Sequence, residues 1–386
     1  MRKLAKWGGW AIAIAVVWSA GSAQAAYRLE KDENTWISLG VGMRAELGVQ
    51  KDASGGDWEK DLEFDNGRIY INGSIFKGVG FEFNTDTNLA GLGEPTPEPG
   101  TDPYNDNIRI LDAIAKFKFS DAVQVWAGRF LPPSDRANLS GPYFLNTWNF
   151  PGVPWHYTNV WAGRDNGAAV WGQFKGGKFK YQVGAFQGNR NSGAPNIAAR
   201  LTLNLLDPEP GYYNASTYYG EKDILDIGAV YQVQPGGSRG AVNQEKKAYQ
   251  AWNIDLMFEK KLGDAGTISM NGAVYGYSNG GLDQNAAGLV DTTSDGIGFF
   301  ALAGYILPMD VGFSILKGKI EPTVRFQYYK DETLPGDPKT KRIDAGINWI
   351  FKGHNALLTL NYGNQNNGTS WGNVQEIIVG IQLQYW

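Results

Sequence analysis

Few residues in this chain could carry out acid–base chemistry or bind a metal. The sequence holds two histidines, His156 and His354, and no cysteine, which excludes thiolate metal sites, disulfides and haem attachment through cysteine. His156 lies in a long connection near Ser134, Asp135 and Ser140, which are residue types found in hydrolases. Its neighbours are prolines and tryptophans, however, and a packing or surface role is the better interpretation. The sequence therefore predicts no enzyme and no cofactor.

The acidic stretch 94–106 is the other candidate for a ligand site. Its carboxylates are oxygen donors of the kind that calcium prefers, but prolines separate them. A solvated loop explains this composition better, so we predict no metal site. The run Gly91-Leu92-Gly93 lacks the strand and helix that flank a nucleotide-binding loop.

The other side chains that could have a function are the charged ones on segments of alternating polarity. Their positions depend on the strands that carry them. Short connections such as Gly176-Gly177 alternate along the chain with longer polar ones, as in outer-membrane barrels. The connection 207–224 is longer than its place in this alternation predicts. Sixteen candidate strands alternate apolar and polar residues: 35–49, 67–76, 79–88, 107–119, 122–130, 166–175, 178–187, 197–206, 225–234, 250–260, 266–277, 296–306, 319–329, 341–351, 355–363 and 374–386.

The two faces of these strands differ in polarity. In the first, Ile37, Leu39 and Val41 share one face, whereas Arg44 and Glu46 lie on the other. The interior of a sixteen-stranded barrel is too wide to be filled by such apolar side chains, so the apolar face must meet lipid. The sequence predicts an all-β fold: a transmembrane antiparallel β-barrel of about 16 strands.

Both ends of the chain indicate export to an outer membrane. Residues 1–25 combine a basic start, a short apolar core and the cleavage site Ala23-Gln24-Ala25, which predicts a signal peptide and a barrel domain over 26–386. Removing three bases with this leader changes the formal charge from -4 to -7, which argues against nucleic acid as a partner. The last strand ends in Tyr385, in register with the apolar row, and Trp386 one residue beyond.

One connection, 131–165, is far longer than most loops. It is rich in tryptophan, tyrosine and proline, a composition that does not favour disorder. Exposing so much apolar area in a free flap would be costly. We therefore expect this loop to fold into the lumen of the barrel.

Four motifs around this loop resemble the phosphate-selective porin O and P family. They are A-G-R-F-L-P-P (127–133), G-R-D-N-G-A-A-V-W-G (163–172), Y-Q-V-G-A-F-Q-G-N (181–189) and A-A-R-L (198–201). The resemblance covers about 80 residues, and elsewhere only the barrel pattern is shared. It implies a sixteen-stranded, usually trimeric channel with inward loops and a preference for anions.

When the apolar row of each strand is taken to face outward, as many acids as bases fall on the inward face. The bases concentrate on strands between residues 107 and 206, which predicts a basic arc and a transverse field that orients polar solutes. Alternatively, cross-strand ion pairs satisfy these charges locally. The charged candidates for lining a pore are Lys116, Arg129, Asp135, Arg136, Arg164, Asp165, Arg200 and Arg325.

Two classes of function remain. The favoured one is an outer-membrane porin for passive diffusion of small hydrophilic solutes, with anions such as phosphate implied by the resemblance. The alternative is a scaffold or sleeve for a surface or electron-transfer partner. Expected partners are outer-membrane lipid, lipopolysaccharide and further copies in a homotrimer. A sleeve needs an open lumen and a porin needs a constriction, so the inward loop discriminates between them.

Overall fold

The computed structural model describes residues 27–51, 57–87, 108–153, 163–190, 192–238, 247–278, 295–333, 336–366 and 373–386. The predicted leader, the acidic stretch 94–106 and His156 lie outside these ranges.

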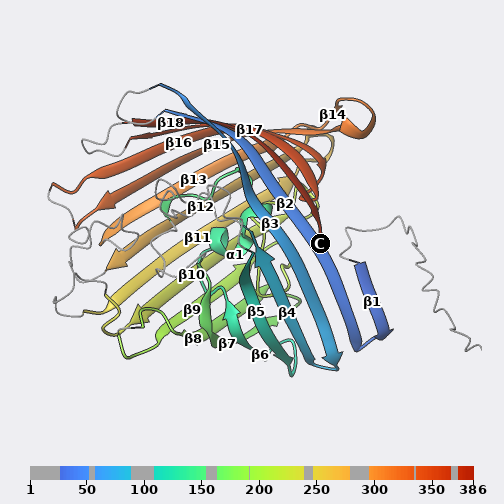
Figure 1. Ribbon diagram of the computed structural model, residues 1–386, viewed down its shortest axis with the longest axis vertical. Coiled ribbons are helices and arrows are strands. Elements are labelled where there is room, and N and C mark those ends of the chain that lie inside the picture. The colour runs from blue at the N-terminus through green and yellow to red at the C-terminus, as the bar shows by residue number, and fades with distance from the viewer. Residues whose placement is uncertain are drawn as a thin grey trace, which may run out of the picture.

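Sixteen long antiparallel strands form a closed barrel (Figure 1). Each strand pairs with its neighbours in chain order, and the last strand pairs with the first long one through Tyr385 and Val41. Every strand expected from the alternation is present. The strands are β2 (Thr35–Lys51), β3 (Glu59–Phe76), β4 (Val79–Asp86), β5 (Arg109–Lys118), β6 (Gln124–Phe130), β7 (Asp165–Phe174), β8 (Phe179–Phe186), β9 (Asn196–Asn204), β10 (Ile224–Gln234), β11 (Tyr249–Lys261), β12 (Thr267–Ser278), β13 (Gly296–Ile306), β15 (Gly318–Asp331), β16 (Lys339–Lys352), β17 (Ala356–Asn366) and β18 (Asn373–Tyr385).

Two short strands were not expected. β1 (Tyr27–Asp32) forms a hairpin with the start of β2, where Tyr27 lies opposite Leu39. β18 occupies the same edge of β2 from Val41 onwards, so β1 continues the line of β18 along that edge. β14 (Asp310–Val311) pairs with β15 inside the connection 307–317.

The outer face of the wall is apolar and the inner face is polar, as the alternation predicted. Side chains of the outward row remain open to the surroundings, among them Val41 at 52% and Leu201 at 54% exposed. Inward side chains are buried although many are charged, including Arg200 at 2% and Arg325 at 1% exposed. A continuous apolar outer surface of this kind indicates contact with lipid.

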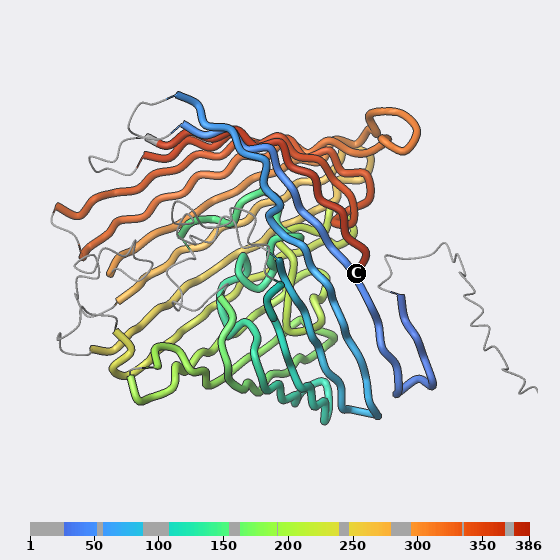
Figure 2. Tube along the Cα trace, viewed as in Figure 1, coloured from blue at the N-terminus to red at the C-terminus, as the bar shows by residue number. Residues whose placement is uncertain are grey.

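Two segments fold into the barrel from opposite rims (Figures 1 and 2). The lumen loop, residues 131–153 and 163–164, enters from the rim with long connections and carries the one-turn helix α1 (Arg136–Ser140) and the 3₁₀ turn Pro142–Phe144. The plug segment, residues 205–223, enters from the rim with short turns and contains no strand. Its length explains why the connection 207–224 departed from the alternation. No helix among the described residues is long and apolar enough to cross a membrane.

The register predicts that the last two residues are needed for barrel closure. Tyr385 pairs with Val41, and the Trp386 ring packs edge-on against Tyr70 of the wall and Phe144 of the lumen loop. Deleting Tyr385 and Trp386 should abolish the heat-modifiable gel migration of the folded barrel. The substitution Ile315→Ser, at an 88% exposed position outside the wall, is the control and should assemble normally. Normal assembly of the truncated chain would contradict the assignment of β18 as the closing strand.

Candidate functional site

The lumen loop crosses the whole interior of the barrel. It leaves the end of β6, and its Pro133 carbonyl accepts a hydrogen bond from Gln232 of β10 at 2.8 Å. Further along, the Asn146 carbonyl accepts one from Asn348 of β16 at 2.7 Å. The loop then reaches β12, where the Tyr277 hydroxyl donates to the Val153 carbonyl at 2.8 Å. The loop thus touches strands around the entire wall and satisfies its own backbone groups there.

The plug segment packs against the lumen loop from the other side. Its Ser216 amide donates to the Phe144 carbonyl at 2.9 Å. Tyr212 stacks on Trp126 of β6 with the ring centroids 4.6 Å apart, and its hydroxyl donates to the Leu131 carbonyl at 2.9 Å. Two segments that enter from opposite rims therefore pack against each other inside the barrel.

Arg136 joins the lumen loop, the plug segment and the wall. Its Nη2 lies 2.5 Å from Glu209 Oε2 of the plug segment and 2.9 Å from Asp226 Oδ1 of β10. The side chain is 3% exposed. Burial alone would raise the pKa of Glu209, but the guanidinium of Arg136 reverses this effect and brings that pKa down to about 2. Removing one partner would leave an uncompensated buried charge, at a cost of about 3–5 kcal/mol.

Arg200 and Arg325 hold the loop to the wall in a similar way. Arg200 makes a two-bond ion pair with Asp255 at 2.5 and 2.8 Å and donates to the Ser134 carbonyl. Arg325 pairs with Asp344 at 2.9 Å and donates to the Asn149 carbonyl at 2.7 Å. Both guanidiniums thus bind an acid of the wall and a backbone carbonyl of the lumen loop.

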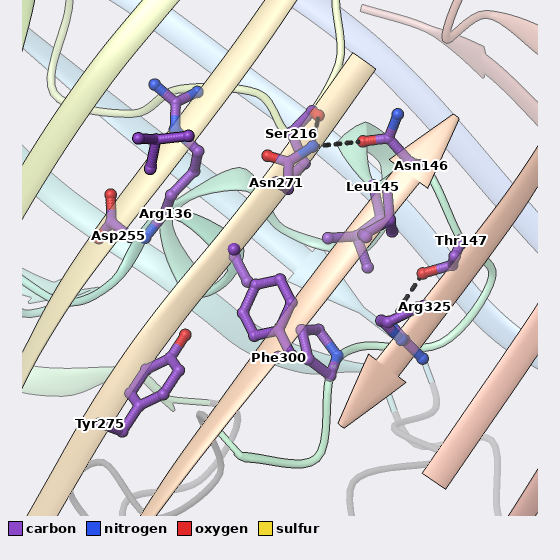
Figure 3. A pocket seen from close by; sticks show the side chains of 15 residues that line it. Arg136, Leu145, Asn146, Thr147, Ser216, Asp255, Asn271, Tyr275, Phe300 and Arg325 are labelled. Carbon is purple, nitrogen blue, oxygen red and sulfur yellow. Dashed lines mark hydrogen bonds between the residues drawn. The ribbon is translucent and has the colours of Figure 1, made fainter. Parts of the chain in front are cut away.

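A small cavity remains where these elements meet (Figure 3). Its volume of about 20 Å³ is enough for roughly one water molecule. Arg136 and Asp255 lie on one side of it and Arg325 on another, while Asn271 donates to the side chain of Asn146 at 3.2 Å. The lumen loop, the plug segment and the wall therefore leave little free space between them at this point.

Local pairing, the alternative to the predicted basic arc, describes several bases of the wall. Lys116 pairs with Glu82, and Arg200 pairs with Asp255. Lys175 is exposed at the β7–β8 turn. Acids of the wall thus pair with two bases of the arc, while the buried Lys180 forms no salt bridge among the described residues.

The structure brings most of the predicted pore candidates to the lumen side but buries them. Asp135, Arg136, Arg164 and Asp165 were expected to face water, and none is more than 8% exposed. Asp135 caps α1 by accepting hydrogen bonds from the backbone amides of residues 137 and 138. Arg164 pairs with Asp112 at 3.2 Å, and Asp165 accepts from the Gly188 amide.

Arg129 has a different location. It pairs in register with Ala113 and Asn166, and this row continues to Phe117 and Val170, which are exposed on the outside. Gly128 precedes it with φ 134, a conformation that glycine adopts readily. The register thus places Arg129 in the outward row, and a pore-lining role for it is not supported.

His354, at the turn between β16 and β17, is a site residue that the sequence did not reveal. Its Nδ1 lies 3.1 Å from the Tyr143 carbonyl of the lumen loop, and its Nε2 lies 2.9 Å from the Thr217 carbonyl of the plug segment. A neutral imidazole donates from only one nitrogen. Burial lowers the pKa of His354 to about 4, although both carbonyls favour the protonated ring. This one side chain connects both inward segments to the wall.

Solved structures with the same fold are outer-membrane proteins. OmpF of Salmonella typhi in complex with daunomycin is 14% identical, with 93% of this chain and 100% of that chain covered and a TM-score of 0.61. An anion-selective porin from Comamonas acidovorans is 15% identical, with 91% and 100% covered and a TM-score of 0.56. The trimer form of OmpT of Vibrio cholerae is 11% identical, with 92% and 100% covered and a TM-score of 0.55.

At these identities the likeness shows the fold, a closed sixteen-stranded barrel of the outer-membrane porin type. No protein-family model matches the chain, and no curated protein matches it in sequence. The resemblance to the phosphate-selective porins therefore stays a prediction.

The environment of His354 predicts a pH dependence of stability. Because its pKa falls from an ordinary value of 6.5 to about 4 on folding, the unfolded chain gains a proton before the folded one does. Stability is complete above pH 6.5 and decreases as the pH falls towards 4, by about 3 kcal/mol from this group. The denaturant midpoint of detergent-folded protein should therefore drop from pH 7 to pH 4.5 by less in His354→Gln than in the unsubstituted chain. An equal drop in both proteins would show that His354 is not buried in this way.

Proposed function

We propose that this chain is an outer-membrane porin through which small hydrophilic solutes diffuse passively. The observation that carries the proposal is the inward placement of the lumen loop, which crosses a closed barrel whose inner face is polar. Such a loop narrows the channel inside the closed barrel. A sleeve for a threaded partner needs an open lumen, and two inward segments occupy that space. The apolar outer row supports insertion of the mature chain, residues 26–386, among lipid and lipopolysaccharide.

The finer proposal is that the solutes include anions such as phosphate and that the channel works as a homotrimer. The motifs around the lumen loop support the anion preference, and one similar barrel carries the name of an anion-selective porin. Another is named as a trimer form. Several inward bases are paired with acids of the wall, so an anion preference must depend on the few partly exposed charges rather than on a basic ladder. Lys116, with 26% of its side chain exposed, is such a charge.

Planar-bilayer conductance tests the channel directly. The purified chain should form channels of small conductance because both inward segments narrow the lumen. Replacing 142–153 with a short glycine–serine linker should raise the conductance, and replacing 210–220 as well should raise it further. If neither replacement changes the conductance, the lumen is not the path and the scaffold alternative becomes the better one. If the first alone gives the full increase, the plug segment is not a constriction.

Charge at Lys116 should influence ion selectivity. Lys116→Glu places a carboxylate beside Glu82 in the wall, so the reversal potential in a salt gradient should move towards cations. The effect should shrink at high salt, since charges in wet regions are screened within roughly 10 Å at 0.1 M. The swapped pair Lys116→Glu with Glu82→Lys restores neutrality and is the matched control. A reversal potential that is unchanged in the single variant would place Lys116 away from the ion path.

A further inference from the structure

Three carboxylates on the inner face of β2 and β3 lie close together. One carboxylate oxygen each from Glu46, Glu63 and Asp65 lies within 4.8 Å of the other two. A β-bulge in the β2–β3 register, between Arg44 and Glu46, brings them together. It places the consecutive residues Asp65 and Asn66 both in buried positions, as bulges do when they redirect a side chain.

Several inward acids of the wall are paired with arginine, whereas Glu259 and Glu321 are satisfied by neutral hydrogen-bond donors. Asp86, Asp255 and Asp344 each have an arginine nitrogen within 2.9 Å. Among the described residues, no lysine or arginine forms a salt bridge with Glu46, Glu63 or Asp65.

Asp65 is the most buried of the three carboxylates. It is 6% exposed, and its Oδ1 has no hydrogen-bond partner within the part of the chain that the structure describes. Arg44 is adjacent but donates elsewhere, to Asn66 Oδ1 at 3.1 Å and to the Trp148 carbonyl at 2.6 Å. Leaving a buried carboxylate oxygen without a partner is costly, and a cation bound beside it would remove this cost.

Charge and geometry define that ligand. Three carboxylates and one guanidinium leave a local charge of about -2, which one divalent cation balances. Calcium binds oxygen at about 2.3–2.6 Å in a flexible geometry, so three carboxylate oxygens within 4.8 Å of one another can share one ion, whereas magnesium demands near-ideal octahedral geometry. Glu46 and Glu63 are only partly buried, which leaves room for water to complete the coordination. We propose that Glu46, Glu63 and Asp65 form a Ca²⁺ site on the inner wall.

The site also connects the wall to the lumen loop. Trp148 of the loop donates its indole N–H to Glu46, and the Arg44 guanidinium lies 3.8 Å from the centroid of the Trp148 ring. An ion bound by Glu46 therefore fixes the oxygen to which the loop is anchored. This binding inference does not depend on the proposed transport function, because a barrel without conductance would still present the same carboxylates.

Calcium titration of the full chain tests the proposal. The protein is refolded in detergent without lipopolysaccharide, treated with EDTA and titrated with CaCl₂ in a calorimeter. We expect one saturable Ca²⁺ site per chain, weaker binding of Mg²⁺, and a loss of affinity of roughly tenfold or more in Asp65→Asn and in Glu63→Gln. The control Glu332→Gln removes a carboxylate outside the barrel wall and should bind as the unsubstituted chain does.

A second readout covers the case in which a variant fails to fold. Tb³⁺ replaces Ca²⁺ in oxygen sites, and its luminescence on tryptophan excitation should fall in Trp148→Phe and disappear when excess Ca²⁺ is added. Absence of a saturable signal in both experiments would overturn the proposal and show that the carboxyl groups are neutralised by protons. Undiminished affinity in a folded Asp65→Asn, Glu63→Gln double variant would overturn it as well.

Discussion

A barrel of sixteen strands encloses more space than the side chains of its own wall can fill. In this chain the space is occupied by two segments of backbone, and each brings peptide groups that need hydrogen-bond partners away from bulk water. The inner wall provides those partners as amides, hydroxyls and ion pairs. The polar inner face is therefore needed for packing as much as for any solute.

Buried ion pairs determine where the inward segments lie. A guanidinium such as that of Arg136 is stable inside the barrel only while its carboxylates remain in place, since breaking one side of a buried pair costs more than forming it gains. Because Glu209 belongs to the plug segment and Asp226 to β10, the two inward segments and the wall stabilise one another. Displacing one inward segment would expose charges on the other.

Much of the fold could be predicted from the sequence, because a strand with lipid on one side and a polar interior on the other must alternate. The inward fold of the lumen loop followed from its aromatic composition. The pairing of Arg136 with Glu209 could not be predicted, since these residues are 73 positions apart and meet only when two loops from opposite rims are packed together. Arg129 was predicted to line the pore although it shares the parity of Val125 and Ala127, which the alternation itself places on the outward row. The sequence contained one indication of the plug segment, a connection longer than the other turns at its rim. It did not indicate that this connection folds into the barrel.

The edge of β2 has a consequence for the order of assembly. β1 covers its first part and β18 the rest, so a single strand is completed by segments from near both ends of the chain. The hairpin of β1 and β2 can form as soon as its residues are available, whereas the pairing with β18 must wait for every intervening strand. Closure then joins residues separated by most of the polypeptide, a contact with a large loop-closure entropy. Until that step β2 presents an unpaired edge, which is the part of the molecule most in need of protection by a chaperone or by the assembly machinery.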